Sequence, residues 1–182
     1  MHRTHLQALL AAHTPTDARE AADRDRMAAF VAAHPDCFGR SNPLGHITGS
    51  ALVAAPDGRL LFLWHGKLHR WLQPGGHSDA HEHDPLQTAL REATEETGLL
   101  DLAPVSPTPL DVDIHVIPAR GSEPAHDHLD VRYLLRTRQP DALVMSHESR
   151  ALRWFEHSEL GGLGFDPQLE RLVGKALKVL GL

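Results

Sequence analysis

Residues 73–99 read QPGGHSDAHEHDPLQTALREATEETGL, and this stretch contains the clearest helix signal of the chain. Asp84 can cap the free amides at a helix start, Pro85 fits the first turn, and Gly98 provides a stop. Between them, apolar residues recur with the i, i+3, i+4, i+7 spacing of one helix face: Leu86, Ala89, Leu90 and Ala93. The spacing predicts an amphipathic helix over 84–98 whose apolar stripe is buried and fixes the orientation of the other faces.

Three glutamates share another face of this helix. Glu92, Glu95 and Glu96 fall at i, i+3 and i+4, so their carboxylates become neighbours. Like charges at these spacings cost a few tenths of a kcal/mol per pair, with Arg91 beside them as a partial offset. Mg²⁺ or Mn²⁺ would relieve this repulsion, because these ions take oxygen ligands and bridge carboxylates to phosphates. On the spacing alone, a solvated acidic face is the better explanation.

The same stretch carries a longer pattern of glycine, glutamate and arginine. Its fixed positions are Gly76, Glu82, Arg91, Glu92, Glu95, Glu96, Gly98 and Leu99. The pattern resembles the signature of the Nudix hydrolases, Gly-x5-Glu-x7-Arg-Glu-U-x-Glu-Glu-x-Gly-U, in which U is aliphatic. Here eight residues rather than seven separate Glu82 from Arg91, and Ala93 is smaller than the usual aliphatic residue. The extra residue precedes the helix, so it leaves the helical geometry intact and the role of Glu82 open.

The resemblance implies an enzyme in which water attacks phosphorus and cleaves the pyrophosphate linkage of a nucleoside diphosphate derivative. Carried over by position, Glu92 and Glu96 resemble the principal metal ligands, and the Gly76 carbonyl an additional one. Glu95 resembles a ligand or the proton acceptor for the water, and Arg91 resembles a residue that orients a carboxylate. Glu95 and Arg91 are therefore the predicted catalytic residues. The implied cofactor is Mg²⁺, with Mn²⁺ as a substitute.

Three further residues are candidates for binding the substrate. Lys67 and His77 flank the Gly-Gly turn, where a phosphate would approach, although Lys67 also fits a simple hairpin-tip charge. Glu148 is the alternative to Glu95 as general base, or else an exposed loop residue. The family patterns for ADP-ribose and for dinucleoside polyphosphates are not met in the window 113–116, so the leaving group stays open.

Polar residues alternate along two expected strands. They are Asp111, Asp113 and His115 on one, and His128, Asp130 and Arg132 on the other, with apolar residues between them. This face could form a substrate-binding wall near the metals. A half-buried antiparallel pair with its wet face outward is slightly favoured for each residue taken alone.

The rest of the chain alternates between helix and strand signals. Helices are expected within the first forty residues and after Asp166-Pro167. Strands are expected at 47–55, 60–64, 70–73, 110–117, 128–137 and 152–156. Together with the resemblance, this predicts an α/β fold, a Nudix-like α/β/α sandwich with a mixed sheet. A helical N-terminal extension (1–40), which is a candidate homodimer contact, would precede a Nudix hydrolase domain (41–182).

The composition of the chain limits which binding partners and which cellular location are expected. The 182 residues include 18 Lys and Arg against 24 Asp and Glu, and a net charge of −6 argues against binding a nucleic-acid polymer. No apolar run approaches the ~20 residues that a membrane-spanning helix needs. Cys37 is the only cysteine, which fits a reducing cytoplasm and a buried packing role. The 15 histidines resemble a compositional bias, so single histidines carry little weight.

Two other functions compete with hydrolysis. A catalytically silent Nudix-fold module could sense a nucleotide without turning it over. Three mutually repelling glutamates argue against this, because a pure binder has no reason to keep them. An isomerase acting on isoprenoid diphosphates would need an active-site cysteine, and Cys37 lies in the helical extension.

Overall fold

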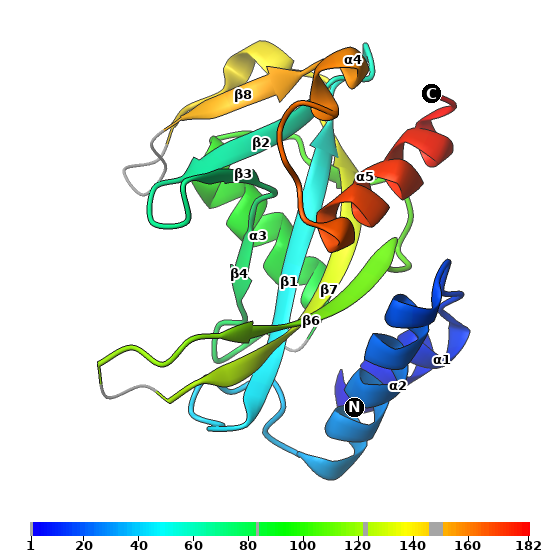
Figure 1. Cartoon of the computed structure of the whole chain (residues 1–182), viewed down its shortest axis with the longest axis vertical. Helices are drawn as coiled ribbons and strands as arrows, with labels where there is room; N and C mark the ends of the chain where they lie inside the picture. The colour runs from blue at the N-terminus through cyan, green and yellow to red at the C-terminus, as the bar shows by residue number, and fades with distance from the viewer. Residues whose placement is uncertain (1, 83, 122–123, 146–150) are drawn as a thin grey trace.

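The computed structural model describes residues 2–82, 84–121, 124–145 and 151–182 (Figure 1). Its helices are α1 (His2–Ala12), α2 (Ala18–Ala33), α3 (Pro85–Thr97), α4 (His157–Leu160) and α5 (Pro167–Leu180), with a 3-10 turn at Pro140–Ala142. Its strands are β1 (Gly45–Ala54), β2 (Leu60–His65), β3 (Arg70–Leu72), β4 (Gly75–His77), β5 (Ala103–Pro104), β6 (Asp111–Ile117), β7 (His126–Arg136) and β8 (Leu152–Phe155). In these described ranges the strands form one sheet.

The sheet is mixed, as the sequence predicts. β1 and β7 lie parallel at its centre, in register from Gly45↔Asp127 to Ala54↔Arg136. β1 and β2 form the predicted antiparallel hairpin around the turn at 56–58, and β4 and β6 also add antiparallel to the central pair. The α/β class and the mixed sheet are therefore confirmed.

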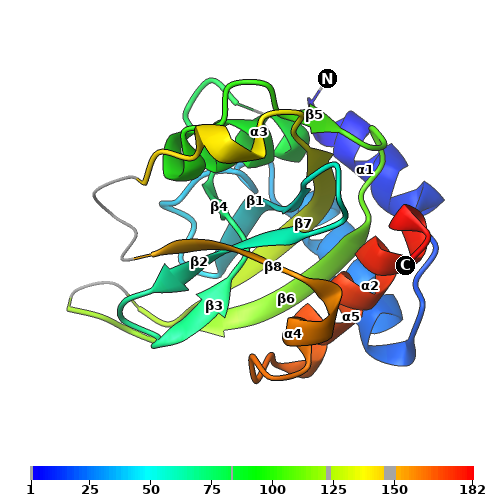
Figure 2. The ribbon, with the colours of Figure 1, turned by 90° about the horizontal axis from the view of Figure 1, so that it is seen from above.

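Helices cover both faces of the sheet (Figure 2). The side chains of β1 alternate between two cores, as the strand period requires. Ala51 and Val53 join the core beneath α3, which also receives side chains from α1 and α2, whereas Leu52 and Ala54 join the core beneath α5. The result is the predicted sandwich of helices, sheet and helices.

Local sequence determines where α3 begins and ends. The Asp84 carboxylate accepts a hydrogen bond from the Leu86 N–H, and Gly98 closes the helix in the left-handed region with φ 73°. Ala89 and Ala93 are fully buried against the sheet. At Gly49 of β1 an added Cβ would lie 2.3 Å from the Pro85 carbonyl oxygen, so glycine permits the close approach of helix and strand.

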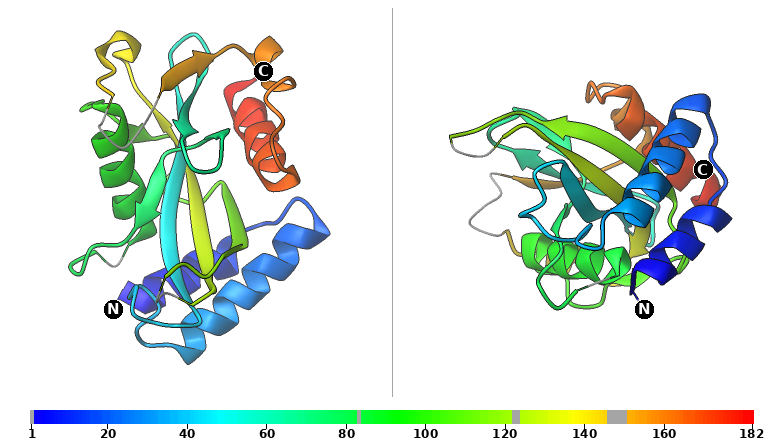
Figure 3. Two further views of the ribbon diagram at one scale, coloured as in Figure 1. Left: turned by 60° about the vertical axis from the view of Figure 1, so that its left-hand side comes forward. Right: turned by 90° about the horizontal axis from the view of Figure 1, so that it is seen from below.

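The two N-terminal helices pack on the rest of the chain (Figure 3). Asp17 caps α2, and Met27 and Val31 are buried in the core shared with α3. An arginine of α2, Arg19, donates a hydrogen bond of 3.1 Å from Nη2 to the Ile114 carbonyl of β6. The helical character of this segment is confirmed, while the boundary between 1–40 and 41–182 stays a prediction.

A buried ionic cluster fastens α2 to α5. The fully buried Glu20 is paired with Lys175 and with His13, and Lys175 Nζ lies 3.1 Å from Asp111 Oδ2. Arg171 Nε lies 2.7 Å from the same Asp111 oxygen. Burial alone would raise the pKa of Glu20, but the hydrogen bonds from His13 and Lys175 lower it far below its ordinary value.

Several short elements were not expected from the sequence. They are β4, β5, α4 and the 3-10 turn. The other expected elements occur within two residues of their predicted bounds. Among the helices in the described part of the chain, none has the length and apolar character needed to cross a membrane.

Candidate active site

A polar cleft of about 1090 Å³ runs along the sheet face that carries α5. One wall is formed by Gly75, Gly76 and His77 of β4 together with Glu92, Glu95 and Glu96 of α3. The other wall is formed by Asp113 and His115 of β6 and by His128, Asp130 and Arg132 of β7. The structure thus brings the helix glutamates and the alternating polar residues to one cavity.

The wall at β4 depends on its two glycines. β4 pairs with β1, and Gly76 lies directly opposite Gly49. A Cβ added to Gly76 would lie 2.4 Å from Glu92 Oε1, so only glycine leaves room for this carboxylate. The Gly75 N–H donates a hydrogen bond of 3.0 Å to Glu96 Oε2. Two of the three glutamates are therefore held against the backbone of β4.

Arg91 connects the glutamates to the strand. Its Nη2 donates to the His77 carbonyl at 2.6 Å and lies 3.0 Å from Glu92 Oε1. Its Nη1 donates to Glu95 Oε2 at 3.1 Å. The carboxylates around the guanidinium raise the pKa of Arg91, so it stays charged. One cation thus faces several anions, and the group keeps an excess of negative charge.

Glu82 has a defined place despite the longer spacing before Arg91. Its carboxylate is buried and accepts hydrogen bonds from the Asp79 N–H, the Thr88 hydroxyl and the Arg91 guanidinium. Burial raises the pKa of Glu82, but the hydrogen bonds from Arg91, the Asp79 N–H and Thr88 together outweigh it, and the net shift is downward. Glu82 therefore fastens the loop before α3 to the helix, and the extra residue is accommodated within that loop.

The donor set suits a hard divalent cation. Burial raises the pKa of Glu92, and the pairing with Arg91 lowers it only in part, while the neighbouring Glu95 and Glu82 add to the rise. Glu96 lies beside it, Glu95 is exposed at the rim, and the Gly76 backbone touches the Glu92 carboxylate. Oxygen ligands with excess negative charge are what Mg²⁺ and Mn²⁺ prefer, so the residues present fit such an ion.

The polar residues of β6 and β7 form a buried network in the other wall. Asp130 accepts hydrogen bonds from the hydroxyls of Thr48 and Ser50, at 3.0 and 2.6 Å. The Arg132 guanidinium donates to Asp130 and to Asp113, both at 2.9 Å. The slightly favoured interpretation of a wet face turned outward is therefore wrong. The alternation shows only which residues share a face of the sheet. Here Asp113, Asp130 and Arg132 on that face are buried, paired with one another, and border the cleft.

Histidines from four strands gather in one cluster, of which His77, His115 and His128 line the cleft. Its members are His46, His77, His115, His126 and His128, and the rings of His46 and His77 have centroids 4.9 Å apart. Burial, with the nearby charges adding, lowers the pKa of His77 to about 4 and that of His128 to about 2, so both are neutral at pH 7. The cluster is not visible in the sequence, because most of its histidines are far apart along the chain and meet only through strand pairing.

The remaining residues singled out in the sequence, Lys67, Glu148 and Cys37, are not among the described residues that line the cleft. Lys67 is exposed in the turn between β2 and β3, outside the residues that line the cleft. Glu148 lies outside the described residues. Cys37 is fully buried in the core beneath α3, and burial raises the pKa of its thiol, which confirms a packing role.

Comparison with known proteins identifies the family. The model of the NUDIX domain matches residues 46–176, so the chain belongs to the Nudix family. A curated relative is the "Probable DHNTP pyrophosphohydrolase" of Lactococcus lactis subsp. cremoris (strain MG1363), 38% identical over 106 residues. The match covers 57% of this chain and 61% of the relative, so the chain spans about three-fifths of the length of the curated relative it matches.

Solved structures share the fold. A NUDIX-family hydrolase from Clostridium perfringens superposes with a TM-score of 0.56 at 27% identity, over 74% of this chain and 97% of that one. The dihydroneopterin triphosphate pyrophosphohydrolase of E. coli also has a TM-score of 0.56, at 17% identity over 75% and 96% of the two chains. The second likeness is one of fold alone.

Proposed function

We propose that this chain is a metal-dependent hydrolase that cleaves the pyrophosphate linkage of a nucleoside diphosphate derivative. The observation that supports this best is the close packing of the Glu92 carboxylate on the Gly76 backbone, beside Glu96 and Arg91, in a large polar cleft. This packing concentrates negative charge at a place where a cation could bridge the carboxylates to a phosphate chain.

Glu92, Glu95, Glu96 and the Gly76 carbonyl would hold Mg²⁺, with Mn²⁺ as a substitute. When bound, the ion neutralises charge on the phosphate oxygens and makes a bound water more acidic. These residues are available because β4 and α3 already place them along one wall of the cleft.

Two side chains have further roles in the proposed reaction. Water attacks phosphorus, the bond from phosphorus to the bridging oxygen breaks, and the phosphate leaves with that oxygen. Glu95, exposed at the rim, accepts the proton of the water. Arg91 is a positioning residue, because it holds Glu92 and Glu95 relative to the His77 carbonyl.

The cleft also suggests the class of substrate. Arginines also line it: Arg19, Arg26, Arg40 and Arg70. Guanidinium groups recognise phosphates through paired hydrogen bonds. The name of the Lactococcus relative makes dihydroneopterin triphosphate the first compound to test, alongside nucleoside triphosphates and nucleoside diphosphate derivatives.

A substrate screen tests the proposal. The full chain is incubated with each compound, with Mg²⁺, with Mn²⁺ or with chelator, and phosphate is read after phosphatase coupling. We expect product with at least one compound, dependent on the divalent ion. Binding of a nucleotide without product at any metal concentration would instead support the sensing module. The cytoplasmic location and the homodimer through 1–40 stay predictions.

A further inference from the structure

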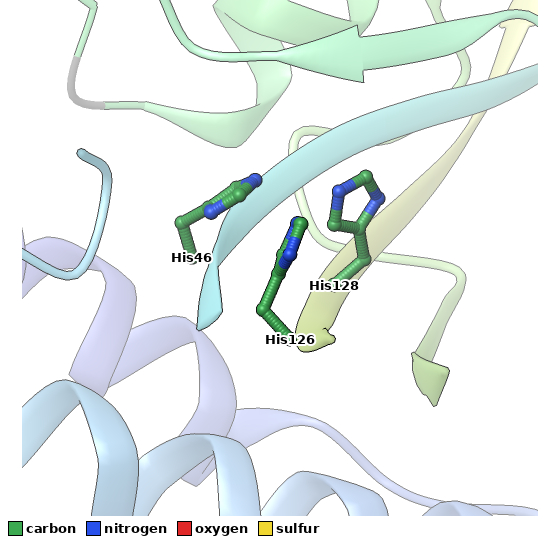
Figure 4. A group of neighbouring side chains, drawn as sticks. All are labelled: His46, His126 and His128. Atoms are coloured by element: carbon green, nitrogen blue, oxygen red, sulfur yellow. The ribbon is translucent and has the colours of Figure 1, made fainter. Parts of the chain in front are cut away.

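Three histidines beside the cleft converge without any contribution from the glutamates. His46 of β1 is the register partner of His128 on β7, and His126 precedes His128 by two residues, so all three share one face of the sheet. One ring nitrogen from each lies within 4.8 Å of the others. Figure 4 shows the three imidazole rings close together at the end of the parallel pair.

We propose that His46, His126 and His128 form a binding site for a borderline divalent transition-metal ion of the Zn²⁺ class, separate from the helix glutamates. Imidazole nitrogen is a preferred ligand for such ions, whereas Mg²⁺ prefers oxygen. Three histidines with an open fourth position are an established arrangement for zinc. Of the three histidines, His128 also lines the cleft, so water or a phosphate oxygen would reach a fourth position from that side.

The surroundings of His126 prepare it for coordination. Its Nδ1–H donates a hydrogen bond of 2.9 Å to the Pro124 carbonyl, and this leaves the Nε2 lone pair for an ion. Metal-binding histidines characteristically donate their second ring N–H to a carbonyl or a carboxylate, which fixes the tautomer and the ring orientation. His126 itself is buried, whereas its partner Pro124 is exposed.

His128 has a comparable outer partner. Its Nε2 lies 3.2 Å from the Nε2 of His77, so one proton is shared between two nitrogens. When His128 is the donor, its Nδ1 keeps a lone pair for the ion. His77 is assigned as this outer partner rather than as a ligand, because its nitrogen contacts His128 and it is not among the three histidines whose nitrogens converge within 4.8 Å.

The rest of the neighbourhood tolerates a cation. His115 contacts the His128 ring and is itself hydrogen-bonded through Nδ1 to Asp113 Oδ2 at 3.0 Å. Asp127, between the two β7 histidines in the chain, pairs with Arg26 at 3.0 Å and points away with the odd-numbered residues. The Asp113 carboxylate thus lies behind the histidine that contacts His128, and Asp127 is paired with an arginine of α2.

Zinc binding to the full chain tests this site independently of hydrolysis. Zn²⁺ is titrated against a chromophoric chelator in excess Mg²⁺, which occupies the glutamates, and Co²⁺ is added in parallel for its visible spectrum. We expect one Zn²⁺ per chain and the intense absorption of a tetrahedral Co²⁺ site with nitrogen ligands. His126→Ala and His128→Ala should each weaken Zn²⁺ binding by about 100-fold or more.

Matched variants separate this site from other candidates. His5→Ala, which removes an exposed histidine of α1, should leave Zn²⁺ affinity unchanged. Glu96→Gln should also leave it unchanged, because the glutamates are not ligands of this ion. Retained hydrolysis with absent zinc binding would overturn this proposal alone, whereas zinc binding without hydrolysis would overturn only the proposed function.

Three results would overturn the site. They are no stoichiometric Zn²⁺ binding in excess Mg²⁺, binding that survives in both histidine variants, and binding that Glu96→Gln abolishes. If circular dichroism shows that the variants do not fold, X-ray absorption at the zinc edge of the wild-type protein identifies the ligands of the ion. Imidazole scattering from three histidines supports the site, and an oxygen-only shell contradicts it.

Discussion

Gly76 and Glu92 are in such close contact that a Cβ at residue 76 would lie 2.4 Å from Glu92 Oε1. The clash involves the end of a flexible side chain rather than backbone. Gly76→Ala should therefore fold, with the Glu92 carboxylate displaced from its place beside β4. Because displacements of about 1 Å can cost about 100-fold in rate, we expect a loss of that order in kcat.

The control for this variant is Gly174→Ala, at an exposed position of α5 where an added Cβ meets nothing within 4 Å. It should keep full activity and gain up to about 1 kcal/mol of stability from helix propensity. Equal kcat values for Gly76→Ala and the wild type would refute the importance of the close contact.

Glu96→Gln removes one negative charge and keeps an oxygen that can accept the Gly75 N–H. Hydrolysis should fall by about 100-fold or more, because a metal ligand is lost, while the thermal midpoint stays nearly unchanged. Glu170→Gln, at an exposed position of α5, is the matched control and should be fully active. Activity is measured by coupled phosphate release and the midpoint by scanning fluorimetry.

Arg91→Lys tests the positioning role of the guanidinium. A single ammonium cannot reach Glu82, Glu95 and the His77 carbonyl at once. We expect a loss of about 2 kcal/mol of stability from the poorly paired Glu82 and a fall in kcat of about 10- to 100-fold. Arg153→Lys, at an exposed arginine, should change neither quantity. Wild-type kcat in Arg91→Lys would show that the contacts are dispensable.

Glu20→Gln tests the buried cluster between α2 and α5. Without the Glu20 charge, Lys175 and Arg171 share the Asp111 carboxylate, and breaking a buried ion pair in this way typically costs about 3 kcal/mol or more. Urea unfolding measures the loss, with Glu170→Gln as the exposed control. A change within about 0.5 kcal/mol would show that the cluster contributes little.

The same residue predicts an acid dependence. The folded chain keeps Glu20 ionised far below its ordinary pKa of 4.5, whereas the unfolded chain takes up a proton near that value. Its contribution is therefore complete above about pH 5.5 and declines as the pH falls through 4.5. Urea unfolding at a series of pH values should show a shallower acid loss for Glu20→Gln than for the wild type. Identical slopes would contradict the lowered pKa.

The sequence predicted the features of this fold that depend on neighbouring residues. The cap at Asp84 and the stop at Gly98 are confirmed. Of the predicted stripe of α3, Ala89 and Ala93 are buried, and Leu86 and Leu90 are partly buried against the same core. β4 escaped prediction because glycines carry little strand signal and its pairing with β1 is set by the fold. Likewise, the ion pair of Glu20 with Lys175 joins residues that are 155 positions apart.

In the site, too, residues that are close in the sequence could be predicted and residues that meet only through the fold could not. Glu92, Glu95, Glu96 and Gly76 could be assigned from one signature, because a single turn of helix and one loop carry them. The histidine cluster could not, since His46 and His128 become neighbours only through the parallel pairing of β1 with β7. The period-two alternation of His126, His128 and Asp130 was the available signal. It shows that these residues share a face, but not that His46 of the partner strand lies beside them.

The most direct test of the central claim is a crystal structure with Mn²⁺ and a non-hydrolysable substrate analogue, using anomalous scattering at the manganese edge. We predict anomalous density bounded by the carboxylates of Glu92 and Glu96 and by the Gly76 carbonyl, in contact with a phosphate of the analogue. Manganese elsewhere in the cleft, with these carboxylates facing only Arg91 and the Gly75 amide, would contradict the account.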